Sequence, residues 1–194
     1  MKRRKSRQIT VGNIKIGKDA PISVQSMCNT DTRDVSATLN QIKELYAAGC
    51  DIVRLAIFDM EAAKALGDIK KSSPVPIVAD IHFDYRLALE CCKNGADKIR
   101  INPGNIGSKE RVKMVADACG ERGIPIRIGV NGGSLEKEIL EKYKSPTPDA
   151  LCESALYHAA LLEECSFKDI AISIKSSDVV TTCRAYEKIA KITD

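Results

Sequence analysis

The chain has no tryptophan, 4% aromatic residues and two histidines among its 194 residues. So few rings leave little surface on which bases stack, and the net charge of +4 is mild, so no nucleic-acid partner is expected. No apolar run approaches the ~18 residues of a membrane span. The N-terminus also lacks the apolar stretch of a signal peptide. We therefore expect a cytoplasmic protein without a membrane partner.

Several short motifs are missing as well. The sequence contains no G-x-G-x-x-G, G-x-x-x-x-G-K-[ST] or G-x-S-x-G, which argues against a dinucleotide site, a P-loop and a hydrolase elbow. Its eight cysteines form no C-x-x-C pair and no zinc spacing, so no metal site is expected. Most of them fall in helical patterns, where a free cysteine behaves as a small buried hydrophobe. A redox-active pair of Cys91 and Cys92 is the alternative.

What the sequence does contain is a regular alternation of strand-like and helix-like segments. Asp34 and Thr147 are plausible N-caps of two of the helices. Six such units in a row predict a parallel sheet with right-handed crossovers. The predicted strands cover residues 22–27, 52–57, 76–82, 98–102, 125–131 and 170–176, and the helices that follow them cover 35–48, 60–71, 85–93, 109–122, 148–164 and 179–192.

The first twenty residues look separate from this alternation. Two short alternating runs, 9–11 and 14–16, flank Gly12-Asn13, which is a hairpin signal. We therefore divide the chain into an N-terminal tail with a β-hairpin, residues 1–20, and a main α/β region, residues 21–194.

Polar residues end five of the predicted strands in a row, and this distribution decides between two architectures. An open doubly wound sheet collects its site at one switch point. A TIM-barrel type (β/α)8 domain collects polar residues around the whole C-terminal mouth, which fits better. A complete barrel needs eight units and ~250 residues. We therefore interpret residues 21–194 as a partial TIM-barrel domain of about six units, and expect the gene to continue beyond Asp194.

Four of these strand ends carry a cation, namely Arg54, Arg100, Arg127 and Lys175. A buried cation is costly without a partner, and the only obvious acid in those strands is Asp80. Guanidinium groups match phosphate oxygens two at a time. The pattern therefore predicts a highly anionic ligand, best a diphosphate or two phosphates.

Polar residues of other kinds share these strand ends. His82, Asn102 and Asn131 would add directional hydrogen bonds, and Asp80 would accept from a ligand hydroxyl or fix an arginine. The loop 103–107 either exposes backbone N–H groups to an anion or is a plain tight turn. His158, in a predicted helix, is expected to be structural.

Long strings of the sequence resemble the 4-hydroxy-3-methylbut-2-enyl diphosphate synthase family, from about Ile9 to the end of the chain. They are PISVQSM and NTDTRDV on either side of Cys28, AGCDIVR, VADIHFDYRLAL, DKIRINPGNIG, IPIRIGVNGGSLEK and ISIKSSDV. Cys28 and Gly132 stand where we expect Thr and Ala in that family, and both are small.

The resemblance implies an oxidoreductase of non-mevalonate isoprenoid biosynthesis. Its TIM barrel would bind 2-C-methyl-D-erythritol 2,4-cyclodiphosphate through Arg54, Arg100, Arg127 and Lys175, with Asp80, His82, Asn102 and Asn131 completing the pocket. A smaller C-terminal domain would carry a [4Fe–4S] cluster, reduced by ferredoxin or flavodoxin. In a homodimer, this domain would close over the partner's barrel.

The resemblance also limits what this chain does. The family's cluster ligands, three cysteines and a glutamate, lie in that C-terminal domain, and no cysteine here falls at a matching position. We therefore expect no catalytic or metal-ligating residue and no cofactor in this chain, which would bind substrate at best, without turnover. Two other hypotheses remain: a phosphate-binding barrel transferase of the dihydropteroate synthase type, and a non-catalytic module that binds diphosphates.

Overall fold

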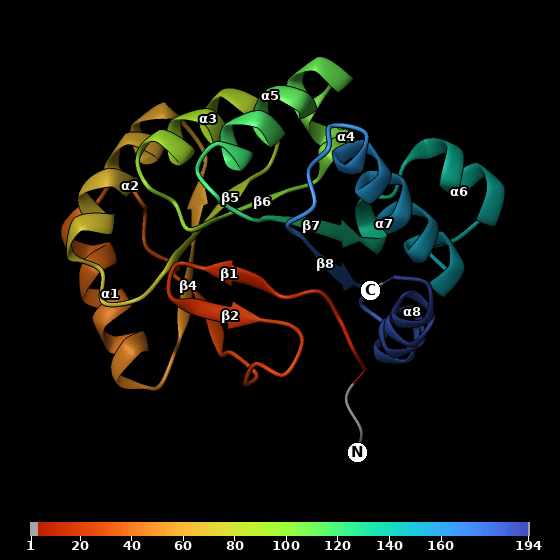
Figure 1. The fold of residues 1–194 in the computed structure, drawn as a ribbon, viewed down its shortest axis with the longest axis horizontal. Helices are drawn as coiled ribbons and strands as arrows, with labels where there is room; N and C mark the ends of the chain where they lie inside the picture. The colour runs from red at the N-terminus through yellow and green to blue at the C-terminus, as the bar shows by residue number, and fades with distance from the viewer. Residues whose placement is uncertain (1–3, 194) are drawn as a thin grey trace.

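The computed structural model describes residues 4–193, so residues 1–3 of the predicted tail and Asp194 lie outside the described part. Six parallel strands form one sheet in chain order, which confirms the predicted parallel α/β architecture. Each strand pairs with the one before it, as in a barrel, and the sheet curls (Figure 1). The strands are β3 (Gln25–Met27), β4 (Ile52–Ile57), β5 (Ile77–Ile81), β6 (Lys98–Ile101), β7 (Ile126–Asn131) and β8 (Ile170–Lys175).

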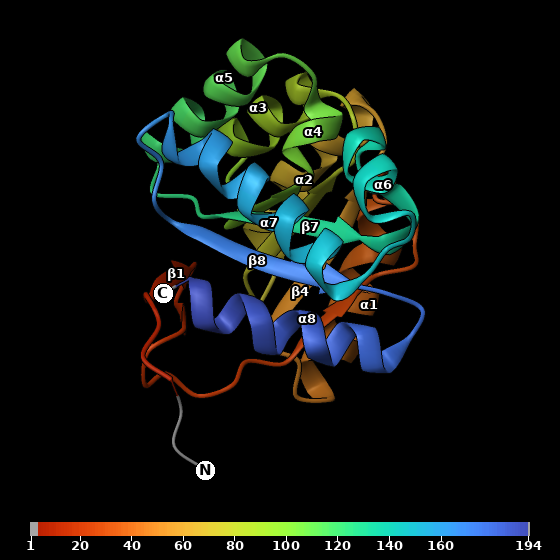
Figure 2. The ribbon, with the colours of Figure 1, turned by 90° about the vertical axis from the view of Figure 1, so that its right-hand side faces the viewer.

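A helix follows each strand, at or near its predicted position. Asp34 and Thr147 cap α1 and α7 by accepting backbone N–H groups, as predicted, and Asp59, Asp84 and Asp178 do the same for α2, α3 and α8. Several of these helices lie along the outside of the curled sheet (Figure 1), and α8 runs beside β8 (Figure 2). The six are α1 (Val35–Ala47), α2 (Met60–Ser72), α3 (Tyr85–Lys93), α5 (Lys109–Gly120), α7 (Pro148–Glu163) and α8 (Val179–Ile192).

Two parts of the prediction were wrong in detail. The first strand is only Gln25–Met27, because Ile22 and Val24 are 83% and 56% exposed at the edge of the sheet and find nothing to pack against. Segments predicted as loops contain the short helices α4 (Pro103–Ile106) and α6 (Lys137–Tyr143) and the 3-10 turn η1 (Gly132–Ser134). These elements are too short to show a helical periodicity. The segment 103–107 is thus not a plain tight turn.

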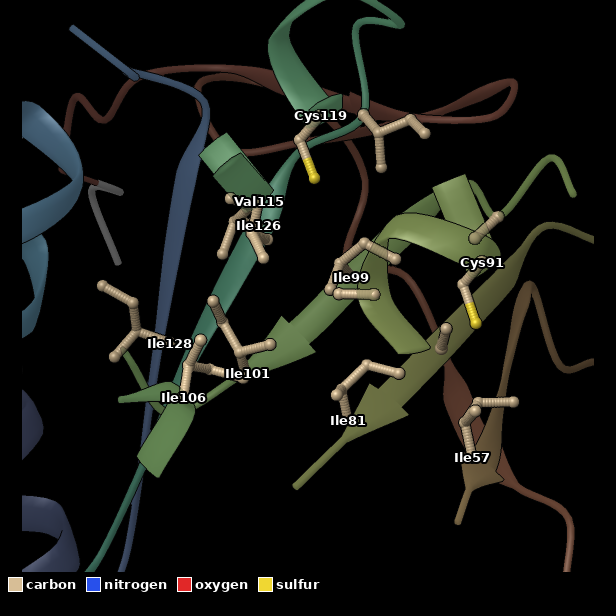
Figure 3. Close-up of a cluster of buried hydrophobic side chains, with 14 of the residues drawn as sticks. Ile57, Ile81, Cys91, Ile99, Ile101, Ile106, Val115, Cys119, Ile126 and Ile128 are labelled. Carbon is tan, nitrogen blue, oxygen red and sulfur yellow. The ribbon is translucent and has the colours of Figure 1, made fainter. Parts of the chain in front are cut away.

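The main core lies between the sheet and the helices. Alternate strand residues such as Ile99 and Ile126 form one buried cluster with Val115 and Cys119 of α5 (Figure 3). Full burial of such an isoleucine stabilises the fold by about 1.5–3 kcal/mol. We call this side of the sheet the outer face.

The opposite side of the sheet, the inner face, packs against the N-terminal hairpin. Val11 of β1 (Ile9–Val11) forms a second buried cluster with Ile52 and Val78, and Ile14 and Ile16 of β2 (Ile14–Ile16) pack against it. The predicted hairpin is therefore confirmed, with Gly12 at a positive φ of 58° in its turn. It covers the inner face near the N-terminal ends of β4 and β5. Within residues 4–193, no helix is both long and apolar enough to cross a membrane.

Candidate functional site

The strand register places the predicted arginines on the inner face. Successive strand residues alternate between faces, so Arg54 lies on the same face as Ile52, and Asp80 on the same face as Val78. Asp80 is level with Arg100 on β6, which is level with Arg127 on β7. The three arginines therefore lie on one concave surface above the hairpin, and we call Arg54, Arg100 and Arg127 the arginine cluster.

Asp80 is the carboxylate around which this site is built. Its side chain is buried, with Oδ1 3.1 Å from Nη1 of Arg100 and Oδ2 3.6 Å from Nε of Arg54. Nε2 of His82 lies 3.5 Å from Oδ2. Arg54 also donates to the sulfur of Met27, at 2.8 and 3.0 Å. One carboxylate thus contacts two arginines and a histidine, and cannot balance the charge of both arginines.

Arg127 is the arginine with unsatisfied hydrogen-bonding capacity. Its Nε is buried and has no hydrogen-bond partner among the described residues. Burial lowers the pKa of Arg127, and the nearby Arg54 and Arg100 lower it further, whereas Asp80 acts in the opposite direction. A buried N–H without a partner, in a field of like charges, favours an anion that would satisfy it.

Lys98 is a further inner-face cation that the sequence prediction did not include. It is buried on β6, two residues before Arg100, and its Nζ lies 3.3 Å from Oε1 of Gln25. Burial, then Arg127 and Arg54, lower its pKa to about 8. The alternation that selected Arg100 and Asn102 includes Lys98 as well. It was missed because only the polar ends of the strands were considered.

Asn102, Asn131 and Lys175 lie closer to the C-terminal mouth. The side-chain oxygen of Asn102 accepts the N–H of Gly104 at 3.1 Å, and that of Asn131 accepts the N–H of Gly133 at 3.3 Å. Lys175 is exposed at the end of β8, level with Asn131. Among the described residues, no hydrogen bond or ion pair joins these three side chains to the arginine cluster. Five of the eight predicted residues therefore lie together, namely Arg54, Asp80, His82, Arg100 and Arg127. The other three lie around the rim of the mouth.

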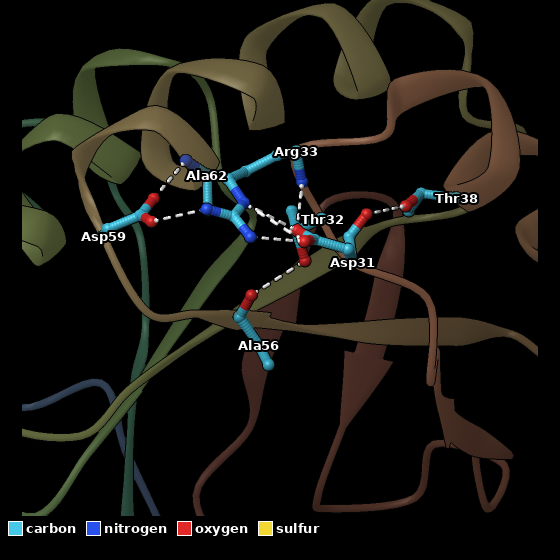
Figure 4. A network of polar contacts seen from close by, with 7 residues as sticks. All are labelled: Asp31, Thr32, Arg33, Thr38, Ala56, Asp59 and Ala62. Atoms are coloured by element: carbon cyan, nitrogen blue, oxygen red, sulfur yellow. Dashed lines mark hydrogen bonds and ion pairs between the residues drawn. The ribbon is translucent and has the colours of Figure 1, made fainter.

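Two loops at the mouth are tied together by a second polar network (Figure 4). Arg33, after β3, pairs with Asp31 at 2.6 Å and with Asp59, after β4, at 3.4 Å. Thr32 donates to the carbonyl of Ala56 at 2.7 Å. The hydrogen bonds from Arg33 lower the pKa of Asp31 to about 2. This network fixes the loop after β3 against the end of β4, beside Arg54.

Gly129 of β7 leaves the space that the guanidinium of Arg100 occupies. A Cβ atom at this position would lie 2.4 Å from Nε of Arg100. We therefore expect Gly129→Ala to displace the Arg100 side chain from Asp80 and to lower the free energy of unfolding by about 1–3 kcal/mol. Urea denaturation followed by circular dichroism measures this. Gly120→Ala is the control, since its Cβ would meet only Phe167 at 3.9 Å. Equal stabilities of the two variants would contradict the steric role of Gly129.

The described residues do not fit the iron–sulfur cluster that the family resemblance implies. No three His, Cys, Asp or Glu side chains among them gather in a way that could hold a metal. Seven of the cysteines are buried or partly buried, and Cys183 is exposed. A cluster with three cysteine ligands therefore has no site within residues 4–193.

Proteins with closely similar sequences are described as 4-hydroxy-3-methylbut-2-en-1-yl diphosphate synthase (flavodoxin). The one from Ruminiclostridium cellulolyticum is 62% identical over 191 residues, which is 98% of this chain and 54% of the relative. The one from Clostridium perfringens is 60% identical over 186 residues, 96% of this chain and 53% of the relative. The chain thus spans about half the length of the curated relatives it matches.

Solved structures with a similar fold have very different sequences. Dihydropteroate synthase from Yersinia pestis superposes with a TM-score of 0.65 at 10% identity, covering 95% of this chain and 70% of that one. A truncated 3-deoxy-D-arabino-heptulosonate 7-phosphate synthase from Thermotoga maritima gives 0.63 at 13%, covering 90% and 59%. At such identity the likeness shows the fold alone.

A family model decides the assignment. The model for the GcpE TIM-barrel domain matches residues 6–194, nearly the whole chain, and the six βα units are those of the predicted partial barrel. The chain therefore belongs to the GcpE TIM-barrel domain family.

Proposed function

We propose that this chain is the substrate-binding barrel portion of a flavodoxin-dependent 4-hydroxy-3-methylbut-2-enyl diphosphate synthase, and that it binds 2-C-methyl-D-erythritol 2,4-cyclodiphosphate. The observation that carries the proposal is the arginine cluster with Lys98 and a single carboxylate, Asp80, on one concave surface. Four cations against one anion leave an excess of positive charge, which a diphosphate neutralises. The names of the close relatives specify a diphosphate product, which supports a diphosphate ligand.

Each side chain has a distinct part in this proposal. Arg127 offers its unpaired Nε to a phosphate oxygen, and Arg54 and Arg100, held by Asp80, offer their remaining N–H groups. The side-chain oxygens of Asn102 and Asn131 accept backbone N–H groups, so their NH2 groups stay available to donate. His82, beside Asp80, and the exposed Lys175, at the rim, would also contact the substrate.

The reaction would be a two-electron reductive opening of the cyclic diphosphate in isoprenoid biosynthesis. The C–O bond at C2 breaks, and the linear allylic diphosphate forms. A [4Fe–4S] cluster held by residues outside this chain would deliver the electrons it receives from flavodoxin, or from ferredoxin. This chain's own residues bind and orient the substrate. The working enzyme would be a cytoplasmic homodimer, and the barrel alone would bind without turnover.

Isothermal titration calorimetry of this chain with the cyclic diphosphate tests the proposal. Replacing Arg127 or Arg100 by glutamine should weaken binding by about 10- to 100-fold, because one charge-assisted contact contributes about 1.5–3 kcal/mol. Arg184→Gln, an exposed arginine of α8, is the control and should bind like wild type. Absence of binding by the folded wild-type chain, or equal affinities of all variants, would contradict the proposed site.

Inorganic pyrophosphate in the same titration separates this function from a general diphosphate-binding module. A site shaped for the cyclic substrate should prefer it, since Asn102, Asn131 and His82 would, in this proposal, also bind the methylerythritol hydroxyl groups. Pyrophosphate that binds as tightly as the cyclic compound would favour the general module.

A further inference from the structure

Two cysteine thiols lie in contact between the outer helices, away from the arginine cluster. Cys92 is near the end of α3 and Cys119 near the end of α5, and their sulfur atoms are 3.5 Å apart. Both side chains are buried, and the two helices pack side by side (Figure 1). This pairing corrects the sequence-based alternative of Cys91 with Cys92, because the thiol of Cys92 meets Cys119, on the neighbouring helix.

A surface hollow adjoins this pair. Its volume is about 380 Å³, and its lining includes Cys92, Arg122, Asp97 and the hairpin residues Thr10 and Gly12. The hairpin covers the N-terminal ends of the strands, so the hollow lies at the end of the barrel opposite the proposed substrate site. A small polar oxidant in this hollow would be next to Cys92.

The surroundings of the two thiols make them unequal. The hydrogen bond from the Cys119 thiol, together with the charge of Arg122, lowers the pKa of Cys92. The hydrogen bond to Cys92 raises the pKa of Cys119, and burial and the charge of an ionised Cys92 raise it further. Burial also raises the pKa of the neighbouring Cys91. The thiolate is the reactive form of cysteine, and Cys92 lines the hollow whereas Cys119 does not, so we take Cys92 as the nucleophile and Cys119 as the thiol that resolves the sulfenic acid.

We propose that hydroperoxides oxidise Cys92 and Cys119 to an intrachain disulfide that joins α3 to α5. The Cys92 thiolate attacks one oxygen of hydrogen peroxide, the O–O bond breaks, and a sulfenic acid forms; the hydroxide that leaves takes up the proton released by the Cys92 thiol and becomes the first water. The Cys119 sulfur then attacks the sulfenic sulfur, the S–O bond breaks, and a second water leaves with the Cys119 proton. Two thiols and one hydrogen peroxide thus give one disulfide and two waters.

The bond requires the two sulfur atoms to move closer together. The sulfurs must approach from 3.5 Å to about 2.05 Å. Rotation of two side chains on helices that already pack together supplies a shift of this size. The resulting cross-link would fix the ends of α3 and α5, and it is independent of the substrate site.

The folded chain is treated with stoichiometric hydrogen peroxide, alkylated after denaturation and mapped by tryptic mass spectrometry. We expect a cross-linked pair of peptides, one containing Cys91 and Cys92 and the other Cys119, that has lost two hydrogens. Cys91→Ser is the matched control and should retain this product. Cys92→Ala and Cys119→Ala, checked for folding by circular dichroism, should both lose it.

Three results would overturn the proposal. The first is recovery of both Cys92 and Cys119 as alkylated thiols while the exposed Cys183 is oxidised. The second is a cross-link that appears only after denaturation. The third is loss of the cross-link in Cys91→Ser as complete as in Cys92→Ala.

Discussion

Replacement of Asp80 by asparagine is expected to lower the free energy of unfolding by about 3–5 kcal/mol, the usual effect of removing one partner of a buried ion pair. The amide would leave Arg54 and Arg100 without their common carboxylate. Both arginines lie near Arg127 and Lys98, and these positive charges already repel one another. The fold would then hold four inner-face cations with no acid among the residues described on those strands. Urea denaturation at neutral pH measures the loss.

The matched control for this variant is Asp31→Asn. Asp31 also pairs with an arginine, at 2.6 Å, but both side chains are about half exposed. Water screens such a pair, so the expected loss is within about 1 kcal/mol. Losses that agree to within about 0.5 kcal/mol would show that burial of Asp80 among cations does not stabilise the fold.

Replacement of Lys98 by methionine is expected to act in the opposite direction, raising the free energy of unfolding at pH 7 by roughly 3 kcal/mol. The pKa of Lys98 falls from 10.5 to about 8 on folding, and each unit corresponds to about 1.4 kcal/mol. Methionine has a similar length and fills the buried space without a charge. The gain arises because the folded chain no longer has to hold a protonated amine beside Arg127 and Arg54.

The pH dependence of this gain follows from the sign of the pKa shift. Below about pH 8, Lys98 is protonated in both states, so its full unfavourable contribution is present and the gain is largest. Between about pH 8 and 10.5 the unfolded chain binds more protons at this residue than the folded chain, so wild-type stability rises and the gain shrinks. Denaturation at pH 7 and pH 10 detects the change. Lys93→Met, exposed on α3, is the control and should show no comparable pH dependence.

These two variants also show that the site combines stabilising and destabilising residues. Asp80 stabilises the inner face, whereas Lys98 and the unsatisfied Nε of Arg127 are held there at a cost in stability. Residues that destabilise a fold yet share one surface are typical of binding sites, because the ligand supplies the missing partner. This is the physical basis on which the proposed diphosphate site rests.

The periodicity of the sequence was sufficient to predict most of the fold. The apolar runs and the helix caps at Asp34 and Thr147 indicated six βα units, and five of the six predicted strands lie within one or two residues of the observed limits. The strand 22–27 and the segments that contain α4 and α6 were less predictable. Edge residues such as Ile22 and Val24 obtain no neighbours to bury them, and helices of four or seven residues have too few turns to show a pattern.

The sequence was sufficient to predict which face of the sheet carries the site, but not which side chains contact one another there. Alternation along a strand puts Asp80 and His82, or Arg100 and Asn102, on one face, because the side-chain period of a strand is two, and the register between strands then puts Arg54, Asp80, Arg100 and Arg127 on the same face. Which atoms meet depends on the pairing register and on the curl of the sheet. These alone place Arg100 across Gly129, expose Lys175 at the rim, and bring buried Lys98 close to Arg54 and Arg127.

The sequence by itself therefore determined the parallel α/β architecture, the excess of inner-face cations over acids, and the family to which these strings of residues are similar. Only the tertiary structure decided that Asp80 holds two of the three arginines, that Nε of Arg127 has no partner within residues 4–193, and that Cys92 meets Cys119 across two helices. The physical reason is that composition and periodicity act along the chain, whereas the contacts that build the site and the thiol pair join residues 20 or more positions apart, such as Asp80 with Arg100 and Cys92 with Cys119.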